Sequence, residues 1–263
     1  MSRQILNVHD MTMDFGGLRA VNHVDISMDQ GEIIALIGPN GAGKTTFFNC
    51  ATGVYTPTTG DILIQPPDAS QRSIKGQKPS AIAAQGVART FQNIRLFPNM
   101  TVLENVMIGR HTRLKAGILG AIFRNRATRE EEEQVIHDSY AVLKRMQLEQ
   151  HVNDLASNLP YGAQRRLEIA RALATDPFLL LLDEPAAGMN PQETKNLENL
   201  IKRIRDTEAV SIFLIEHDMN LVMSLSERIY VMDYGRLIAT GTPQEVRNNP
   251  EVIKAYLGEE VIA

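Results

Sequence analysis

The sequence predicts an α/β fold built on a parallel sheet with helices on both faces. Short apolar runs of strand character occur at residues 32–37, 178–182 and 210–215. Nearly every residue in these runs is apolar, as in strands that are buried on both faces of a sheet. Between the last two runs, residues 191–208 repeat apolar side chains at a helical spacing, and Pro191 suits the first turn. Strands that alternate with helices are typical of a parallel sheet.

The composition is that of an ordinary globular protein. The chain has 263 residues, of which 43% are hydrophobic and 22% charged, and its formal net charge is −4. This acidic balance argues against a nucleic-acid partner, because binding to phosphates favours a basic surface. No apolar run approaches the roughly 20 residues that cross a bilayer, and we expect no signal peptide. The single cysteine, Cys50, excludes an intramolecular disulfide.

Two regions depart from the parallel pattern. The first sixty residues hold short strand patterns at 5–8, 20–28 and 61–64, with glycine turns between them, so we expect a small antiparallel sheet there. Residues 101–175 are predominantly helical in pattern. Thr101 and Glu104 form a capping-box pattern, and residues 128–148 start with glutamates that favour a helix N-terminus. The apolar stripe that we expect on this second helix consists of Val135, Ile136, Val142, Leu143 and Met146.

A glycine-rich loop follows the first predicted strand directly. Residues 38–46 read G-P-N-G-A-G-K-T-T and match the phosphate-binding pattern G-x-x-x-x-G-K-[ST], with a helix pattern after them. Glycines let successive backbone N–H groups turn toward a phosphate, and the helix N-terminus adds positive charge. Lys44 would reach the β- and γ-phosphates, and the Thr45 hydroxyl would bind Mg²⁺. The residues expected to bind nucleotide here are Gly38, Pro39, Asn40, Gly41, Ala42, Gly43, Lys44, Thr45 and Thr46.

A second element of a nucleotide site lies at the end of the next apolar run. Asp183 and Glu184 follow the strand pattern at 178–182, and open α/β sheets bind ligands at this edge. We expect Asp183 to hold Mg²⁺ through water, and Glu184 to act as the general base on the attacking water. The sequence thus predicts a P-loop NTPase core with a RecA-like parallel sheet that binds a nucleoside triphosphate and Mg²⁺.

Further motifs follow in order, and together they resemble the ATP-binding subunits of ATP-binding-cassette (ABC) transporters over essentially the whole chain. The resemblance implies that the nucleotide is ATP, that Phe15 stacks on adenine and that Gln92 contacts Mg²⁺ and the attacking water. It also implies that His217 is a switch histidine that holds the γ-phosphate. The family signature, which binds ATP held by an opposite subunit, corresponds to Leu159, Pro160, Tyr161, Gly162 and Ala163, and the D-loop to residues 185–190, with Asn190 last.

The signature departs from the family pattern, which is typically Leu-Ser-Gly-Gly-Gln. Pro160 replaces the serine and offers neither a hydroxyl nor an N–H group, and Asn190 replaces the usual D-loop aspartate. One interpretation is that the site formed by this signature hydrolyses ATP weakly. The other, which we favour, is that the remaining backbone N–H groups and the helix dipole suffice. A non-catalytic regulatory cassette is a rival reading that these departures also favour.

More narrowly, the motifs resemble the longer ATPase subunit of branched-chain amino acid importers. The resemblance implies a peripheral protein on the cytoplasmic face of the bacterial inner membrane, energising uptake of leucine, isoleucine and valine. Its partners would be a second ATPase or a second copy in a head-to-tail dimer, two permeases and, indirectly, a periplasmic solute-binding protein. Importers of urea, other amides or other amino acids are the alternative.

The resemblance also predicts how the chain is organised. We expect a single cassette domain over residues 1–263, with a core at about 1–98 and 176–263 and an inserted helical subdomain at about 99–175. Within that subdomain, residues 117–123 form an apolar run between basic flanks. This run could contact lipid headgroups or a permease, although we favour packing inside the subdomain.

Overall fold

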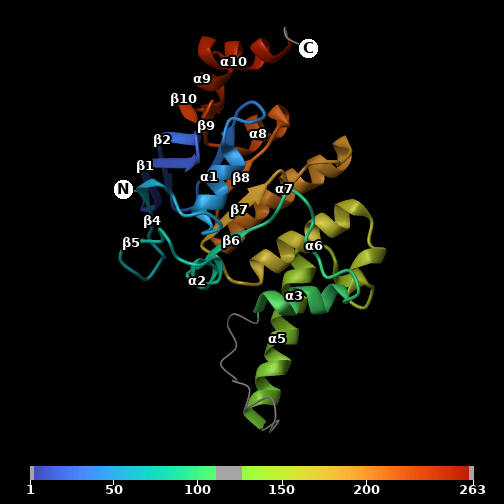
Figure 1. Cartoon of the computed structure of the whole chain (residues 1–263). Coiled ribbons are helices and arrows are strands. Elements are labelled where there is room, and N and C mark those ends of the chain that lie inside the picture. The colour runs from blue at the N-terminus through green and yellow to red at the C-terminus, as the bar shows by residue number, and fades with distance from the viewer. Residues whose placement is uncertain (1–2, 111–125, 261–263) are drawn as a thin grey trace. The chain divides into compact units, whose positions relative to one another are not determined.

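The computed structural model describes residues 3–110 and 126–260 (Figure 1). The chain forms two compact units, the first made of residues 1–89 and 178–263 and the second of residues 90–177. The hydrophobic run at 117–123 lies outside the described residues.

The first unit contains the predicted parallel sheet. Its strands lie in the order β10-β9-β3-β8-β7-β6, with parallel pairing throughout except between β9 and β10. All residues of β3, β7 and β8 are buried, which confirms the three apolar runs as central strands. The six strands are β3 (Ile33–Ile37), β6 (Val87–Arg89), β7 (Leu179–Asp183), β8 (Ser211–Ile215), β9 (Arg228–Asp233) and β10 (Arg236–Gly241).

Helices connect these strands. The helix predicted over residues 191–208 is α7 (Pro191–Glu208), and it buries Leu197, Leu200, Ile201 and Ile204. A proline in its first turn and a capping box stabilise its start. The other helices of this unit are α1 (Lys44–Ala51), α2 (Pro79–Ala84), α8 (Met219–Leu225), α9 (Pro243–Arg247) and α10 (Pro250–Glu260).

The expected antiparallel sheet has the strand order β2-β1-β4-β5. All three predicted strands are longer than expected, and β1 differs most because it continues through residues 9–15 with irregular register and a positive φ at Asp10. Such bulges break the alternation of polar and apolar residues from which a strand is recognised. The strands are β1 (Gln4–Phe15), β2 (Leu18–Asp29), β4 (Thr59–Ile64) and β5 (Arg72–Ser73). Their apolar faces join Phe47, Phe48 and Phe213 in one core.

The second unit is helical, as predicted. In the part of this unit that the structure describes, the α-helices are α3 (Val102–Arg110), α5 (Arg126–Arg145) and α6 (Tyr161–Leu173), with short 3₁₀ turns η2 (Glu149–His151) and η3 (Ala156–Asn158). The Thr101–Glu104 capping box is confirmed, since the Glu104 N–H donates to Thr101 Oγ1 at 3.2 Å and the Thr101 N–H to Glu104 Oε2 at 2.7 Å.

One member of the expected apolar stripe on α5 is wrong. Ile136 is 44% exposed, whereas Val142, Leu143 and Met146 are buried. The buried face continues instead through Ser139, which is three residues before Val142 and fully buried. Ile136 lies seven residues before Leu143 and so on nearly the same side of the helix, and its exposure therefore reflects where along α5 the packing ends.

Candidate active site

The glycine-rich loop takes a path that only glycine allows at two positions. Gly38 and Gly43 have φ values of 149° and 101°. A Cβ atom on Gly38 would lie 2.0 Å from the carbonyl oxygen of Met232, and one on Gly43 would lie 2.4 Å from that of Ala20. The loop therefore packs its bare backbone against neighbouring strands, and it connects β3 to the start of α1.

Lys44, the first residue of α1, is buried within this loop. Its side chain is 6% exposed, and Nζ donates to the carbonyl oxygens of Gly38 and Pro39 at 2.6 and 2.7 Å. The ammonium group is thus held by the loop whose N–H groups we expect to bind phosphates. Thr45 follows in the first turn of α1, where the helix dipole favours negative charge.

Asp183 ends strand β7 with a buried carboxylate. Its Oδ2 lies 2.7 Å from Nη2 of Arg89, and both side chains are about 5% exposed or less. Arg89 ends the adjacent strand β6 and also donates to Asn49 on α1 and to Thr52, the C-cap of α1, at 2.8 and 3.1 Å. Sequence analysis missed Arg89. The usable signal was a basic residue at the end of a short apolar strand, since the neighbouring strand ends in an aspartate.

Glu184 and His217 come together at the carboxyl edge of the parallel sheet. The two residues follow β7 and β8, which are neighbouring strands. Glu184 Oε1 lies 2.7 Å from His217 Nε2, and their side chains are 13% and 45% exposed. Glu184 has a φ of 48°, an uncommon conformation for a residue other than glycine, and its N–H donates to Ile215. The expected base and switch residue are therefore in direct contact.

Glu216, which sequence analysis missed, lies between these elements. It is 3% exposed, and its two oxygens accept hydrogen bonds from three backbone N–H groups, those of Ala186, His217 and Asp218. Burial raises the pKa of this carboxyl, while the three N–H donors act in the opposite direction. Its role could have been suspected from the sequence, because a charged residue stands directly between a buried strand and the histidine expected to be functional.

Two other expected residues belong to the same unit. Phe15 ends β1 with a ring that is 40% exposed and packs edge-on against Tyr55, with centroids 5.2 Å apart. Asn190 is the N-cap of α7, where its side chain accepts from the Glu193 N–H at 3.0 Å. The asparagine that replaces the usual D-loop aspartate thus keeps the capping function.

Gln92 and the signature residues belong to the second unit, where one buried ion pair connects their segments. Arg165 on α6 is fully buried and donates to the carbonyl oxygens of Phe91 and Gln92 at 2.7 and 2.8 Å. Its partner Glu168, at 2.9 Å, accepts from the N–H groups of Phe91 and Arg95. The helix that begins at the signature therefore holds the backbone beside Gln92.

The signature itself forms the start of α6. Pro160 is the N-cap, and its carbonyl oxygen accepts from the N–H groups of Ala163 and Gln164 at 2.9 and 3.0 Å. Leu159 and Ala163 are 5% exposed and Gly162 is buried, whereas Tyr161 is 43% exposed. The substitution of proline for serine is accommodated because an N-cap does not need to donate its own N–H group to the helix.

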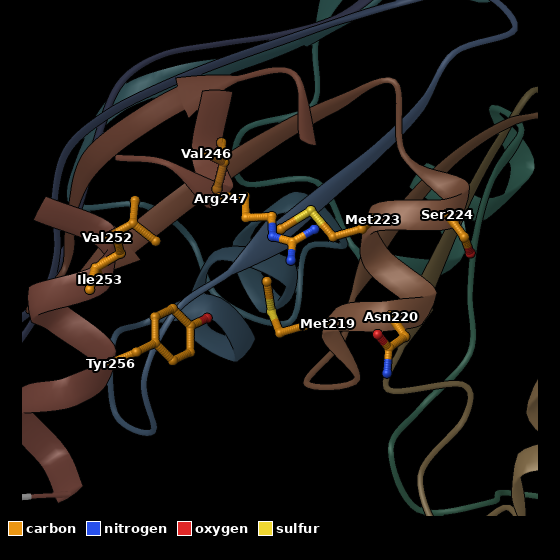
Figure 2. Close-up of a pocket in the computed structure, with 9 residues that line it drawn as sticks. All are labelled: Met219, Asn220, Met223, Ser224, Val246, Arg247, Val252, Ile253 and Tyr256. Carbon is orange, nitrogen blue, oxygen red and sulfur yellow. The ribbon is translucent and has the colours of Figure 1, made fainter. Parts of the chain in front are cut away.

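A separate cavity of about 670 Å³ lies in the first unit, between α8, α9 and α10 (Figure 2). Apolar side chains make up most of its wall, including Met219, Met223 and Tyr256, and Arg247 is its one charged lining residue. None of the predicted site residues lines it. The cavity is therefore distinct from the Glu184–His217 region.

The fold and the phosphate loop define the class of this protein as a P-loop ATPase of the ABC cassette type. The sequence pattern of the family described as "ABC transporter" matches residues 21–187, and that of "Branched-chain amino acid ATP-binding cassette transporter" matches residues 236–262. The chain belongs to the ABC transporter family. It is an ATP-binding cassette, and its expected α/β fold is confirmed.

Full-length relatives agree with this assignment. The chain is 50% identical to the high-affinity branched-chain amino acid transport ATP-binding protein LivG of Escherichia coli K12, covering 98% of this chain and 100% of LivG. It is 48% identical to the corresponding protein BraF of Pseudomonas aeruginosa, with the same coverage. Its structure is similar to the ADP conformation of MJ1267, an ATP-binding cassette of an ABC transporter, with a TM-score of 0.84 and 30% identity over 98% of this chain and 100% of that one.

In the described parts of the chain, no helix combines the length and the apolar character needed to cross a bilayer.

Proposed function

We propose that this chain hydrolyses Mg²⁺-bound ATP to energise an importer of branched-chain amino acids. The proposed hydrolysis is supported above all by the 2.7 Å contact between Glu184 and His217. Glu184 directly follows Asp183 in the chain. The substrate part rests on the 50% identity, over nearly the whole chain, to a protein named for branched-chain amino acid transport.

Nucleotide binding would use the loop of residues 38–46. Lys44 would exchange its two carbonyl partners for the β- and γ-phosphate oxygens of ATP, while backbone N–H groups of the loop bind the β-phosphate. The exposed ring of Phe15 is available to stack on adenine. These interactions would place the γ-phosphate near the carboxyl edge of the sheet.

The donor set fits Mg²⁺, which prefers oxygen ligands. Within the first unit it consists of the Thr45 hydroxyl and the Asp183 carboxylate, and the family resemblance adds the Gln92 amide oxygen as a proposed ligand. No cluster of three His, Cys, Asp or Glu side chains suited to a metal occurs among residues 3–110 and 126–260. We expect the ion to be held partly by the phosphates of ATP. When bound, Mg²⁺ would neutralise charge on the phosphates. Arg89 orients the Asp183 carboxylate for this task.

Hydrolysis then requires a water molecule aligned with the γ-phosphorus. Glu184 takes a proton from that water as its oxygen bonds to phosphorus, and the bond to the β–γ bridging oxygen breaks to leave ADP. The proton passes from Glu184 to phosphate or solvent. His217 orients Glu184 through their hydrogen bond. It would also contact the γ-phosphate of bound ATP, so that it responds to the presence of ATP.

A second cassette would complete the site. The signature residues 159–163 would bind ATP that is held by the phosphate loop of a partner, in a head-to-tail dimer of two copies or of this chain and a second ATPase. Pro160 contributes no N–H group, and the first turn of α6 supplies backbone N–H groups and the positive end of its dipole. Two permeases and a periplasmic binding protein would complete the importer, with this subunit on the cytoplasmic face of the membrane.

ATP hydrolysis by the purified chain, alone and co-expressed with its permeases and partner ATPase, tests the proposal. Wild type should hydrolyse ATP, and Glu184→Gln should bind ATP without turnover. If wild type binds ATP but shows no Glu184-dependent turnover even in the complex, a regulatory cassette replaces the catalytic one. Uptake of labelled leucine against labelled urea by the reconstituted complex tests the solute, and uptake of urea alone would reassign it.

A further inference from the structure

Glu216 is a buried carboxylate, and within the described part of the chain its hydrogen bonds come from backbone N–H groups. It directly follows strand β8 and is 3% exposed. Burial raises the pKa of this carboxyl, and the like charge of Glu184 acts in the same direction. Burying a charged group costs free energy unless the group is hydrogen-bonded. The backbone N–H donors therefore offset the cost of burying the Glu216 carboxylate.

The two oxygens of Glu216 serve two different loops. Oε1 accepts from the Ala186 N–H at 2.7 Å, in the turn that follows Glu184. Oε2 accepts from the N–H groups of His217 and Asp218 at 2.9 and 3.3 Å, in the loop that follows β8. One carboxylate thus joins the backbone next to Glu184 to the backbone of His217.

Both loops are also fixed beyond these contacts. In the first, the Ala187 N–H donates to the Glu184 carbonyl at 3.2 Å, so the turn that begins at Glu184 includes the residue held by Glu216. In the second, Asp218 caps α8 by accepting from the N–H groups of Asn220 and Leu221. A shift of either loop would therefore move one partner of the Glu184–His217 hydrogen bond.

We propose that Glu216 is a positioning residue for ATP hydrolysis, which holds Glu184 and His217 in contact by bridging the two loops that carry them. This inference rests on the proposed roles of Glu184 and His217. It assigns to Glu216 no contact with ATP or water. The same carboxylate also binds the loop of residues 185–190, through the N–H group of Ala186.

The geometry requires two acceptor oxygens. A glutamine at position 216 has one acceptor oxygen and an NH₂ group, which is a donor. Its NH₂ group would face either the Ala186 N–H or the N–H groups of His217 and Asp218, so one loop must be released. Glu216→Gln keeps the shape of the side chain and therefore tests the bridge rather than the packing.

The experiment compares Glu216→Gln with Glu198→Gln in the full complex. Glu198 is a matched control because it is also a buried carboxylate on this unit, but it binds the side chains of Lys195 and Lys202. We expect kcat of Glu216→Gln to fall by about 10²-fold, the size of a misplaced general base, with KM for ATP within twofold of wild type. Glu198→Gln should retain wild-type kcat.

A double variant separates positioning from an independent effect. In the Glu184→Gln background, Glu216→Gln should change the residual rate by less than twofold, because the base that it positions is absent. A kcat within twofold of wild type in the single variant would overturn the proposal, as would a full 10²-fold loss that persists in the Glu184→Gln background. Absence of Glu184-dependent turnover in wild type would instead refute the proposed hydrolysis.

Hydrogen exchange keeps the proposal testable if Glu216→Gln does not fold. In folded wild-type protein, the amides of Ala186 and His217 should exchange slowly, because both are bonded to Glu216. Fast exchange of the Ala186 amide in wild type would show that the bridge is not maintained in solution and would overturn the proposal.

Discussion

Glu184 Oε1 and His217 Nε2 lie 2.7 Å apart, although the two residues are 33 positions apart in the chain. Adjacent parallel strands produce this contact, because Asp183 pairs with Ile215 in the β7–β8 ladder and each functional residue follows shortly after. The carboxyl ends of parallel strands meet at one edge of the sheet, where the phosphate loop also begins. The sheet thus brings the base, the histidine and the phosphate loop to the same edge.

His217→Ala should abolish most of the hydrolysis and leave ATP binding intact. The substitution removes the hydrogen bond that orients Glu184, so kcat should fall by about 10²-fold or more, while the affinity for ATP changes little. Single-turnover kinetics and equilibrium binding of ATP measure the two effects. His9→Ala is the control, since His9 is an exposed histidine on β1 paired with Asp25. Equal activity of the two variants would contradict the role of His217.

Gly38→Ala should destabilise the protein much more than Gly41→Ala. Both glycines have positive φ, but a Cβ on Gly38 would meet the Met232 carbonyl oxygen at 2.0 Å, whereas one on Gly41 meets nothing within 4 Å. We expect a loss of about 1 kcal/mol for Gly41→Ala, from backbone strain alone, and about 3 kcal/mol or more for Gly38→Ala. Urea unfolding of the two variants measures the difference. Equal losses would show that the loop can move away from Met232.

Arg89→Met should destabilise the protein because it leaves Asp183 buried without its ion-pair partner. Removal of one member of a buried pair typically costs about 3–5 kcal/mol. The double variant Arg89→Met/Asp183→Asn should recover a large part of that loss, because it removes the uncompensated charge. Urea unfolding compares the variants. A loss below about 1 kcal/mol in the single variant would show that the guanidinium does not stabilise the carboxylate.

Cys50 should be inert in the folded protein and should make stability fall at high pH. It is 3% exposed, and burial raises its pKa to about 12. In the unfolded chain the thiol ionises from about pH 9, where the folded protein still keeps its proton, so stability falls as pH rises from 9 toward 12. The free energy of unfolding of wild type minus that of Cys50→Ala isolates this effect. A difference independent of pH would contradict the raised pKa, and so would rapid labelling of native Cys50 by a thiol reagent at pH 8.

Local patterns in the sequence determined most of the fold. The three central strands are apolar on every face, and α7 combines a proline, a capping box and a helical apolar spacing, so these elements needed no tertiary information. The phosphate loop was also predictable, because its glycines encode a backbone path directly. Glu184 was predicted from its position directly after such a strand, whereas His217 was predicted from the resemblance to the ABC family.

Tertiary structure alone decided which charged residues support these elements. Arg89 contacts Asp183, which lies 94 positions away in the chain. Glu216 contacts the Ala186 amide, 30 positions away, and Arg165 contacts the Gln92 carbonyl, 73 positions away. A charged residue in a sequence does not identify its partner, because the partner depends on which strands and loops become neighbours. The exposure of Ile136 on α5 has the same origin, since the part of a helix that is buried is set by what packs against it. The sequence by itself therefore determined the secondary structure and the phosphate loop, whereas the packing of distant segments determined how the functional carboxylates are held.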